Sequence, residues 1–226
     1  MRSQVTSSPN TSLRITRSYT LGMLIFPIPE RLRPVTLFTS VYLLIAGYFA
    51  LETQNWEFVF YIAVVVLLGT VVLIVDRRVT LTRNIVWFLS IWGILHMIGG
   101  LVPIPASWPI SGTKQVFYSL WLIPGLLKYD QLVHAYGFGL ATWVCWQSVR
   151  IALPRAEPTP GILLLCALAG MGLGAFNEVV EFVATLLIPD TNVGGYINTG
   201  WDLVANLLGS TVAALVIWGI RPAPRT

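Results

Sequence analysis

GILLLCALAGMGLGAFNEVVEFVATLLI, residues 161–188, decides the fold class of this chain. At 1.5 Å of rise per residue, this apolar stretch is long enough to cross the roughly 30 Å of hydrocarbon in a bilayer as one α-helix. Five further apolar stretches have similar character: Val35 to Leu51, Trp56 to Val75, Ile85 to Val102, Gln131 to Val149 and Trp201 to Ile220. The sequence therefore predicts an all-α polytopic membrane protein, a bundle of six transmembrane helices.

Composition and charge agree with this class. Of the 226 residues, 55% are hydrophobic and 11% charged, and the mean hydropathy of +0.73 lies far outside the range of soluble domains. Because cytoplasmic loops retain Lys and Arg, the basic residues orient the chain with both termini in the cytoplasm of a bacterial-type plasma membrane, leaving only Lys114 and Lys128 outside. This bias accounts for the net charge of +4. No basic patch interleaved with aromatics indicates nucleic-acid binding.

The pattern divides the chain into three regions. Residues 1–34 are expected to form a cytoplasmic tail, in which the apolar segment from Tyr19 to Pro29 is short, broken by prolines and predicted to lie at the interface. Residues 35–220 form the six-helix transmembrane domain, with a polar site on residues 85–220, and residues 221–226 form a second cytoplasmic tail. Cys145 and Cys166 lie at similar depth in adjacent spans, where small buried side chains are expected rather than a redox or metal site.

The long extracytoplasmic connection from Pro103 to Tyr129 is rich in proline and aromatic residues. Its prolines preclude one continuous helix, and its aromatics suit the headgroup layer. Two interpretations stay open: a half-inserted segment that covers the outer mouth of the bundle, or an aromatic anchor with no such role.

Six ionisable side chains lie in or at the ends of the apolar spans, and the topology brings them all to the outer half of the bilayer. At 1.5 Å per residue, His96 lies about 9 Å below the outer end of its span, and Glu178 and Glu181 lie some 10 to 15 Å below theirs. One charged residue at a helix centre costs about 2.5 to 3.5 kcal/mol on insertion scales, so grouping is favoured over scattering. The six are His96, Asp130, His134, Glu178, Glu181 and Asp202.

Angular positions place these groups on faces that meet other helices. At about 100° per residue, Glu178 and Glu181 share a sector with Asn177 and with the small-residue pair Gly170 and Gly174. By the same reasoning, Asp130 and His134 share one face of their span, and Asp202 and Asn206 share one face of theirs. His96 lies on the same face as its neighbouring glycines. We therefore predict a polar site on small-residue faces, supported by Asn177 and Asn206.

Simpler interpretations exist for single residues. Asp130 and Asp202 begin inward-running spans, so helix capping is a sufficient reason for either. His96 alone is explained by a hydrogen bond to a backbone carbonyl. Glu57 and Asp190 are expected to be interfacial and solvated. Glu178 and Glu181 resist such explanations, because their depth leaves short acidic chains no capping role and no route to water.

The stretches LHMIGG (95–100), YDQLVHAYGFG (129–139), NEVVEF (177–182) and NTGWDLVANLLG (198–209) resemble the uncharacterised YjdF-like bacterial inner-membrane proteins, which are similar to the VanZ-like family associated with teicoplanin resistance. The resemblance covers the last four spans. It implies that the Asp and His, the acidic pair and the final Asp and Asn of that family correspond to the residues of the predicted site. Asn198 is a departure, because relatives often have an acidic residue there.

Three functions compete on this evidence. The first is an enzyme that acts on a lipid or lipid-linked headgroup, with His134, Glu181 and Glu178 as catalytic groups and with a divalent metal (Zn, Mn or Fe) among the alternatives for a cofactor. In that case all six ionisable residues are candidate metal ligands. The second is a proton- or cation-coupled transporter or channel, and the third is a structural polar network in a membrane protein that binds a partner. Membrane lipids are the expected partners.

Overall fold

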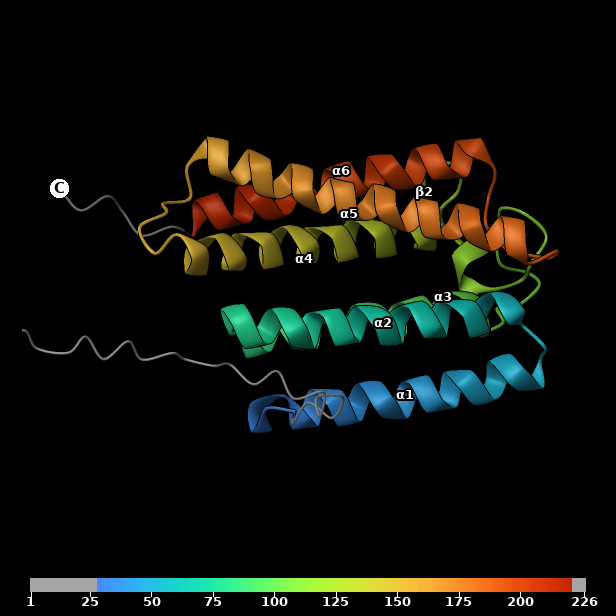
Figure 1. Ribbon diagram of the computed structural model, residues 1–226. Helices are drawn as coiled ribbons and strands as arrows, with labels where there is room; N and C mark the ends of the chain where they lie inside the picture. The colour runs from blue at the N-terminus through green and yellow to red at the C-terminus, as the bar shows by residue number, and fades with distance from the viewer. Residues whose placement is uncertain (1–27, 221–226) are drawn as a thin grey trace, which may run out of the picture.

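The computed structural model describes residues 28–220, and their regular structure is almost wholly helical (Figure 1). The α-helices of this part are α1 (Arg33–Glu52), α2 (Trp56–Val79), α3 (Arg83–Leu101), α4 (Tyr129–Ala152), α5 (Pro160–Leu187) and α6 (Tyr196–Gly219). Three-residue 3-10 turns, η1 (Glu30–Leu32) and η2 (Phe117–Ser119), and two short strands, β1 (Trp121–Ile123) and β2 (Leu127–Lys128), complete it. The all-α class is confirmed. The predicted interfacial segment from Tyr19 to Pro29 lies almost wholly outside the described residues.

Five of these helices, all except α4, are long and apolar enough to cross a membrane. With 24 residues, α4 is as long as α2 and α6 and extends about 36 Å. It is more polar because it includes Gln131 and His134, and both of these side chains are buried in the protein. Composition rather than length therefore sets α4 apart.

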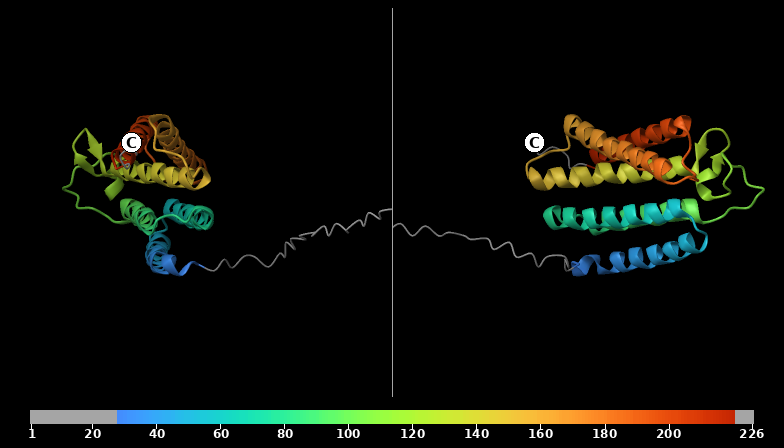
Figure 2. Two further views of the ribbon diagram at one scale, coloured as in Figure 1. Left: turned by 90° about the vertical axis from the view of Figure 1, so that its left-hand side faces the viewer. Right: turned by 45° about the vertical axis from the view of Figure 1, so that its right-hand side comes forward.

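The helices form two groups that meet where α3 packs on α4. Helices α4, α5 and α6 pack closely on one another, and α1, α2 and α3 form the second group (Figures 1 and 2). Helix α4 contacts α3, α5 and α6, so it lies at the centre of the bundle. This position explains why a helix of membrane-spanning length carries polar side chains.

Glycines bring α4, α5 and α6 together, as the predicted small-residue faces require. A Cβ on Gly209 of α6 would lie 1.9 Å from the carbonyl oxygen of Ala135 in α4, so only glycine permits this approach. On α5, a Cβ on Gly174 would lie 2.5 Å from the side-chain nitrogen of Asn206. The acidic face of α5 is therefore also its packing face, and it meets the polar stripe of α6.

Helices α4 and α6 both begin earlier than their apolar stretches predict, and this corrects the capping interpretation of Asp130 and Asp202. The N-cap of α4 is Lys128, so Asp130 is the second residue of the helix. The N-cap of α6 is Gly195, which places Asp202 in the second turn. The polar sequence YINTG forms the first turn of α6, outside the stretch that hydropathy marks.

The connection between α3 and α4 folds over one end of the bundle, beside the α5–α6 connection (Figure 1). Strands β1 and β2 pair antiparallel, with Trp121 opposite Lys128 and Gly125 in the turn at a φ of +73°. Backbone bridges also join Pro103 to Val116 and Ile110 to Leu120. The prolines prevent a continuous helix, as expected, and an irregular hairpin takes its place.

The opposite end of the bundle is tied by one buried ion pair and by apolar packing. Arg31 donates to both oxygens of Asp76, at 2.5 Å each, and to the carbonyl of Leu81 at 2.9 Å. Cys145 and Cys166 are free thiols that pack in the same apolar cluster, where Cys166 is buried, as expected, and Cys145 is only partly buried.

Candidate functional site

His134 is the centre of a polar cluster inside the bundle. Its side chain is 2% exposed, and it projects from α4 toward α5 and α6. Nδ1 donates to the side-chain oxygen of Asn206 at 3.2 Å, which leaves Nε2 as the lone-pair nitrogen. Nε2 lies 3.7 Å from an oxygen of Asp130 and 3.7 Å from an oxygen of Glu181. Asn206 thus orients the imidazole with its basic nitrogen toward carboxylates, as a residue behind a metal ligand commonly does.

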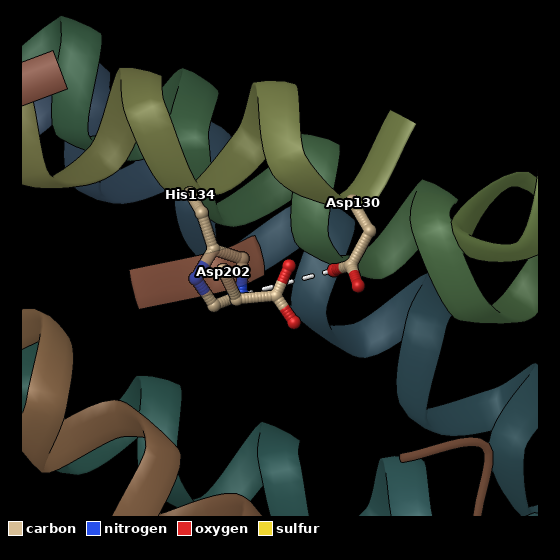
Figure 3. A group of neighbouring side chains, drawn as sticks. All are labelled: Asp130, His134 and Asp202. Atoms are coloured by element: carbon tan, nitrogen blue, oxygen red, sulfur yellow. Dashed lines mark ion pairs between the residues drawn. The ribbon is translucent and has the colours of Figure 1, made fainter. Parts of the chain in front are cut away.

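Four carboxylates from three helices surround this imidazole and form two overlapping groups. In the first group, ligand atoms of Asp130, His134 and Asp202 all lie within 4.8 Å of one another (Figure 3). In the second group, the same holds for His134, Glu178 and Glu181, and an oxygen of Glu178 lies 3.4 Å from Nδ1 of His134. Five of the six predicted residues therefore converge, and His134 belongs to both groups.

Several buried polar atoms of this cluster have no hydrogen-bond partner among residues 28–220. They include both side-chain oxygens of Glu178, one oxygen of Asp202 and the side-chain nitrogen of Asn206. Thr199 and Asn177 lie beside Glu178 without completing a bond of normal geometry. Unpaired buried carboxylate oxygens are costly, so the oxygens of Glu178 and Asp202 require a proton, a cation or a hydrogen-bond donor, whereas the Asn206 nitrogen requires an acceptor.

Lys128 and Asn198 connect the two aspartates at the edge of the cluster, and sequence reasoning did not include Lys128. The Asn198 amide donates to Asp202 at 2.5 Å and to Asp130 at 3.3 Å, and its oxygen accepts from Lys128. Lys128 also lies 3.6 Å from Asp130 and is buried. The Lys128 ammonium group therefore contacts one of the four carboxylates directly. The amide at position 198 bridges two of them, where an acidic residue would repel both.

Asn177, predicted as a supporting residue, donates to Glu181 at 2.8 Å from one helical turn away. This bond holds the Glu181 carboxylate, which is 16% exposed, toward His134. The two predicted supporting asparagines thus position the two central groups of the hypothesis, Asn206 the imidazole and Asn177 the carboxylate.

His96 is close to the cluster but lies outside both groups of potential ligands within the described part of the chain. Its Nδ1 forms a hydrogen bond with the Tyr118 hydroxyl, and its ring packs against Trp92. The partner is a side chain rather than the expected backbone carbonyl. Burial raises the pKa of Tyr118, which lies in the connection outside the helices, well above its ordinary value, so this hydroxyl stays protonated.

Glu57 corrects another expectation, because it is buried and only 3% exposed rather than solvated. The α5–α6 connection covers the first turn of α2, and the backbone N–H of Asn192 donates to Glu57 at 2.7 Å. Lys114 lies 3.9 Å from Glu57 and 3.3 Å from Asp190. Asp190 itself is exposed, as expected.

A cavity of about 490 Å³ connects these groups at the end of the bundle covered by the hairpin. Asp130, Glu181 and His96 line it from the helices, and Tyr118 and Lys128 line it from the α3–α4 connection. This connection therefore contributes to the wall of the cavity. The space is large enough to admit a polar group against the carboxylates.

Chemically, one imidazole nitrogen with several carboxylate oxygens is a mixed N/O ligand set. Such a set suits a divalent ion such as Zn, Mn or Fe. The unpaired oxygens of Glu178 and Asp202 point to the same conclusion, since a cation would satisfy them. The residues present therefore fit a metal ion.

These features define a multi-pass helical membrane protein with a buried histidine and carboxylate cluster at one end. The chain belongs to the family of predicted membrane proteins designated DUF2238, whose family model matches residues 34–223. An uncharacterized protein from Thermotoga maritima is 29% identical over 91 residues, which are 40% of this chain and 47% of that protein. The chain thus matches about half the length of this relative. No solved structure matches the chain.

Proposed function

We propose that this protein is a membrane enzyme that holds a divalent metal ion in its histidine and carboxylate cluster and acts on the headgroup of a lipid or lipid-linked molecule. In this proposal α4 crosses the membrane with the other five helices, and both termini are cytoplasmic. The end of the bundle that carries Lys114 and Lys128 then faces outward, and the end that carries Arg31, Arg77 and Arg150 faces the cytoplasm. The cavity opens in the outer leaflet, at headgroup depth.

The convergence of four carboxylates on His134, with buried oxygens left unpaired, carries the proposal. A structural network would be expected to satisfy its own polar atoms, because a partly satisfied buried network is destabilising. Here neither oxygen of Glu178 has a hydrogen-bond partner among the described residues, although one lies 3.4 Å from Nδ1 of His134. A bound cation removes this cost and provides a chemical role for the same residues.

The arrangement assigns roles to individual residues. His134 is the nitrogen ligand through Nε2, and Asp130, Asp202 and Glu178 are oxygen ligands. Glu181 lines the cavity and is held by Asn177, so it is placed to accept a proton from a water molecule or hydroxyl group next to the headgroup. The metal would supply Lewis-acid polarisation of that group. His96 and Tyr118 form the opposite wall.

One-sided placement favours an enzyme over a channel. The residues that line the polar cavity all come from the hairpin end of the helices and their connections. Toward the other end, α4, α5 and α6 pack through an apolar cluster that includes Trp146, Leu163 and Ile217. A proton or ion pathway requires polar groups along its whole length.

The finer resemblance to YjdF-like and VanZ-like proteins rests on the same residues. The Asp and His of α4, the acidic pair of α5 and the Asp and Asn of α6 all belong to the cluster. We take this coincidence as support for a shared site in those families.

Elemental analysis of the purified full chain in detergent tests the proposal. The expected result is near-stoichiometric divalent metal in the parent protein and its loss in His134→Ala and Glu178→Gln. Two matched variants control for the substitutions: His96→Ala removes the histidine outside the ligand groups, and Glu52→Gln neutralises an exposed glutamate at the end of α1. Both controls should retain metal. A metal-free parent after incubation with Zn, Mn and Fe would overturn the proposal.

A further inference from the structure

A second cavity, of about 300 Å³, forms a groove among α1, α2 and α3. Its walls are mainly aliphatic and include Val35, Leu43, Val65, Leu73 and Leu89. Along one side it is lined by Val66, Leu68 and Gly69 of α2, which are exposed to the surroundings of the protein. Within a membrane these surroundings are lipid chains, so the groove is accessible from the hydrocarbon.

The groove borders the polar cavity. Tyr61 and His96 line both this groove and the polar cavity. Asn177, which holds Glu181, is also in the groove wall. A molecule with an apolar chain and a polar end could therefore occupy both spaces with its polar end beside the carboxylates.

We propose that the groove holds one hydrocarbon chain of a membrane phospholipid whose phosphate headgroup lies in the polar cavity. This inference rests on the proposed function and names its substrate class. The chemistry of the two spaces is complementary to such a molecule, because an aliphatic groove borders a polar cavity that is lined by Asp130, Glu181 and the ammonium group of Lys128, next to the proposed cation site. A phosphate oxygen is a normal ligand for a divalent ion held by carboxylates.

The length of the groove agrees with this occupant. Along α2 it extends from Tyr61 to Leu73, which corresponds to about 18 Å at 1.5 Å per residue. One leaflet contributes about 15 Å, half of the hydrocarbon thickness. A lipid chain that spans one leaflet therefore fills most of the groove when its headgroup is at the outer end.

Photo-crosslinking tests this inference. The full chain is placed in phosphatidylcholine nanodiscs that contain a small fraction of phosphatidylglycerol with a diazirine in one acyl chain, and labelled residues are mapped by mass spectrometry. The same diazirine chain on diacylglycerol, which lacks phosphate, forms the second arm. We expect phosphatidylglycerol to label groove residues several-fold more than the exposed faces of α6, and diacylglycerol to show no such preference.

A matched pair of variants locates the chain. No atom lies within 4 Å of a Cβ built on Gly69, in the groove wall, or on Gly47, which is outside it, so a side chain at either position starts in open space. Gly69→Trp should abolish the preferential labelling, and Gly47→Trp should leave it unchanged. Equal labelling by the two lipids, or no effect of Gly69→Trp, would overturn the inference. Metal content is measured in the same samples. Bound metal without labelling of the groove refutes the binding of a lipid chain in the groove but not the metal ion. Labelling of the groove in a metal-free parent protein refutes the metal ion but not the lipid chain.

Discussion

Replacing Gly209 by alanine tests how the close contact of α4 and α6 builds the site. The added Cβ would lie 1.9 Å from the Ala135 carbonyl oxygen, about 1.5 Å less than the 3.4 Å at which ordinary contact begins. Because the contacted atom belongs to backbone, no side chain can move aside, and the two helices must separate. We expect a cost near the upper end of overpacking, about 3 kcal/mol.

Part of this cost is offset, because alanine in a helix is favoured over glycine by about 1 kcal/mol. The net loss for Gly209→Ala is therefore about 2 kcal/mol, obtained by subtracting the second value from the first. Gly69→Ala is the matched control, since open space surrounds its Cβ and it should gain up to about 1 kcal/mol. The two variants should differ by about 3 kcal/mol in the free energy of unfolding.

Equilibrium unfolding in mixed detergent and SDS micelles, followed by far-UV circular dichroism, measures this difference. Metal content is determined on the same preparations, because separating α6 from α4 also moves Asn206 and Asp202 away from His134. Gly209→Ala should lose metal affinity as well as stability. Equal unfolding free energies for Gly209→Ala and Gly69→Ala would refute the close packing on which the site depends.

Three further predictions concern charges and the groups around the imidazole. Arg31→Leu removes the ion-pair partner of the buried Asp76 carboxylate and should lower the free energy of unfolding by about 3 kcal/mol or more. The control Arg33→Leu removes an exposed ion pair and should change the free energy of unfolding little. Thermal melts of the two variants test this difference. Asn206→Ala removes the bond to Nδ1 of His134 and should weaken metal affinity about 10- to 100-fold in a competitive chelator titration; unchanged affinity would refute the orienting role. Asn198→Asp places a third acidic group beside two aspartates, so it should destabilise the metal-free protein and tighten metal binding; weaker binding with unchanged stability would contradict this.

The sequence predicts the spans and the convergence of Glu178 and Glu181 on His134 because both depend on periodic properties of single helices. Apolar length marks each helix, and glycine spacing marks the face that packs. The polar faces of α4, α5 and α6 must meet one another, because lipid does not solvate them.

Other features depend on the conformations of the segments between helices, whose sequences show no helical periodicity from which their structure could be predicted. Lys128 enters the cluster because the β1–β2 hairpin places it at the N-terminus of α4. Glu57 is buried because the α5–α6 connection folds over it, and Tyr118 reaches His96 from another irregular segment. The early start of α6 was missed because its first turn is polar. Hydropathy alone places none of these residues.

X-ray absorption spectroscopy of the zinc-loaded full chain tests the central claim most directly. The cluster predicts a first shell of oxygen and nitrogen at about 2.0 to 2.2 Å, with outer-shell scattering from a single imidazole and none from sulfur. Loss of that imidazole signal in His134→Ala, and its retention in His96→Ala, would assign it to His134. A spectrum without imidazole scattering, or one that changes only in His96→Ala, would contradict the account.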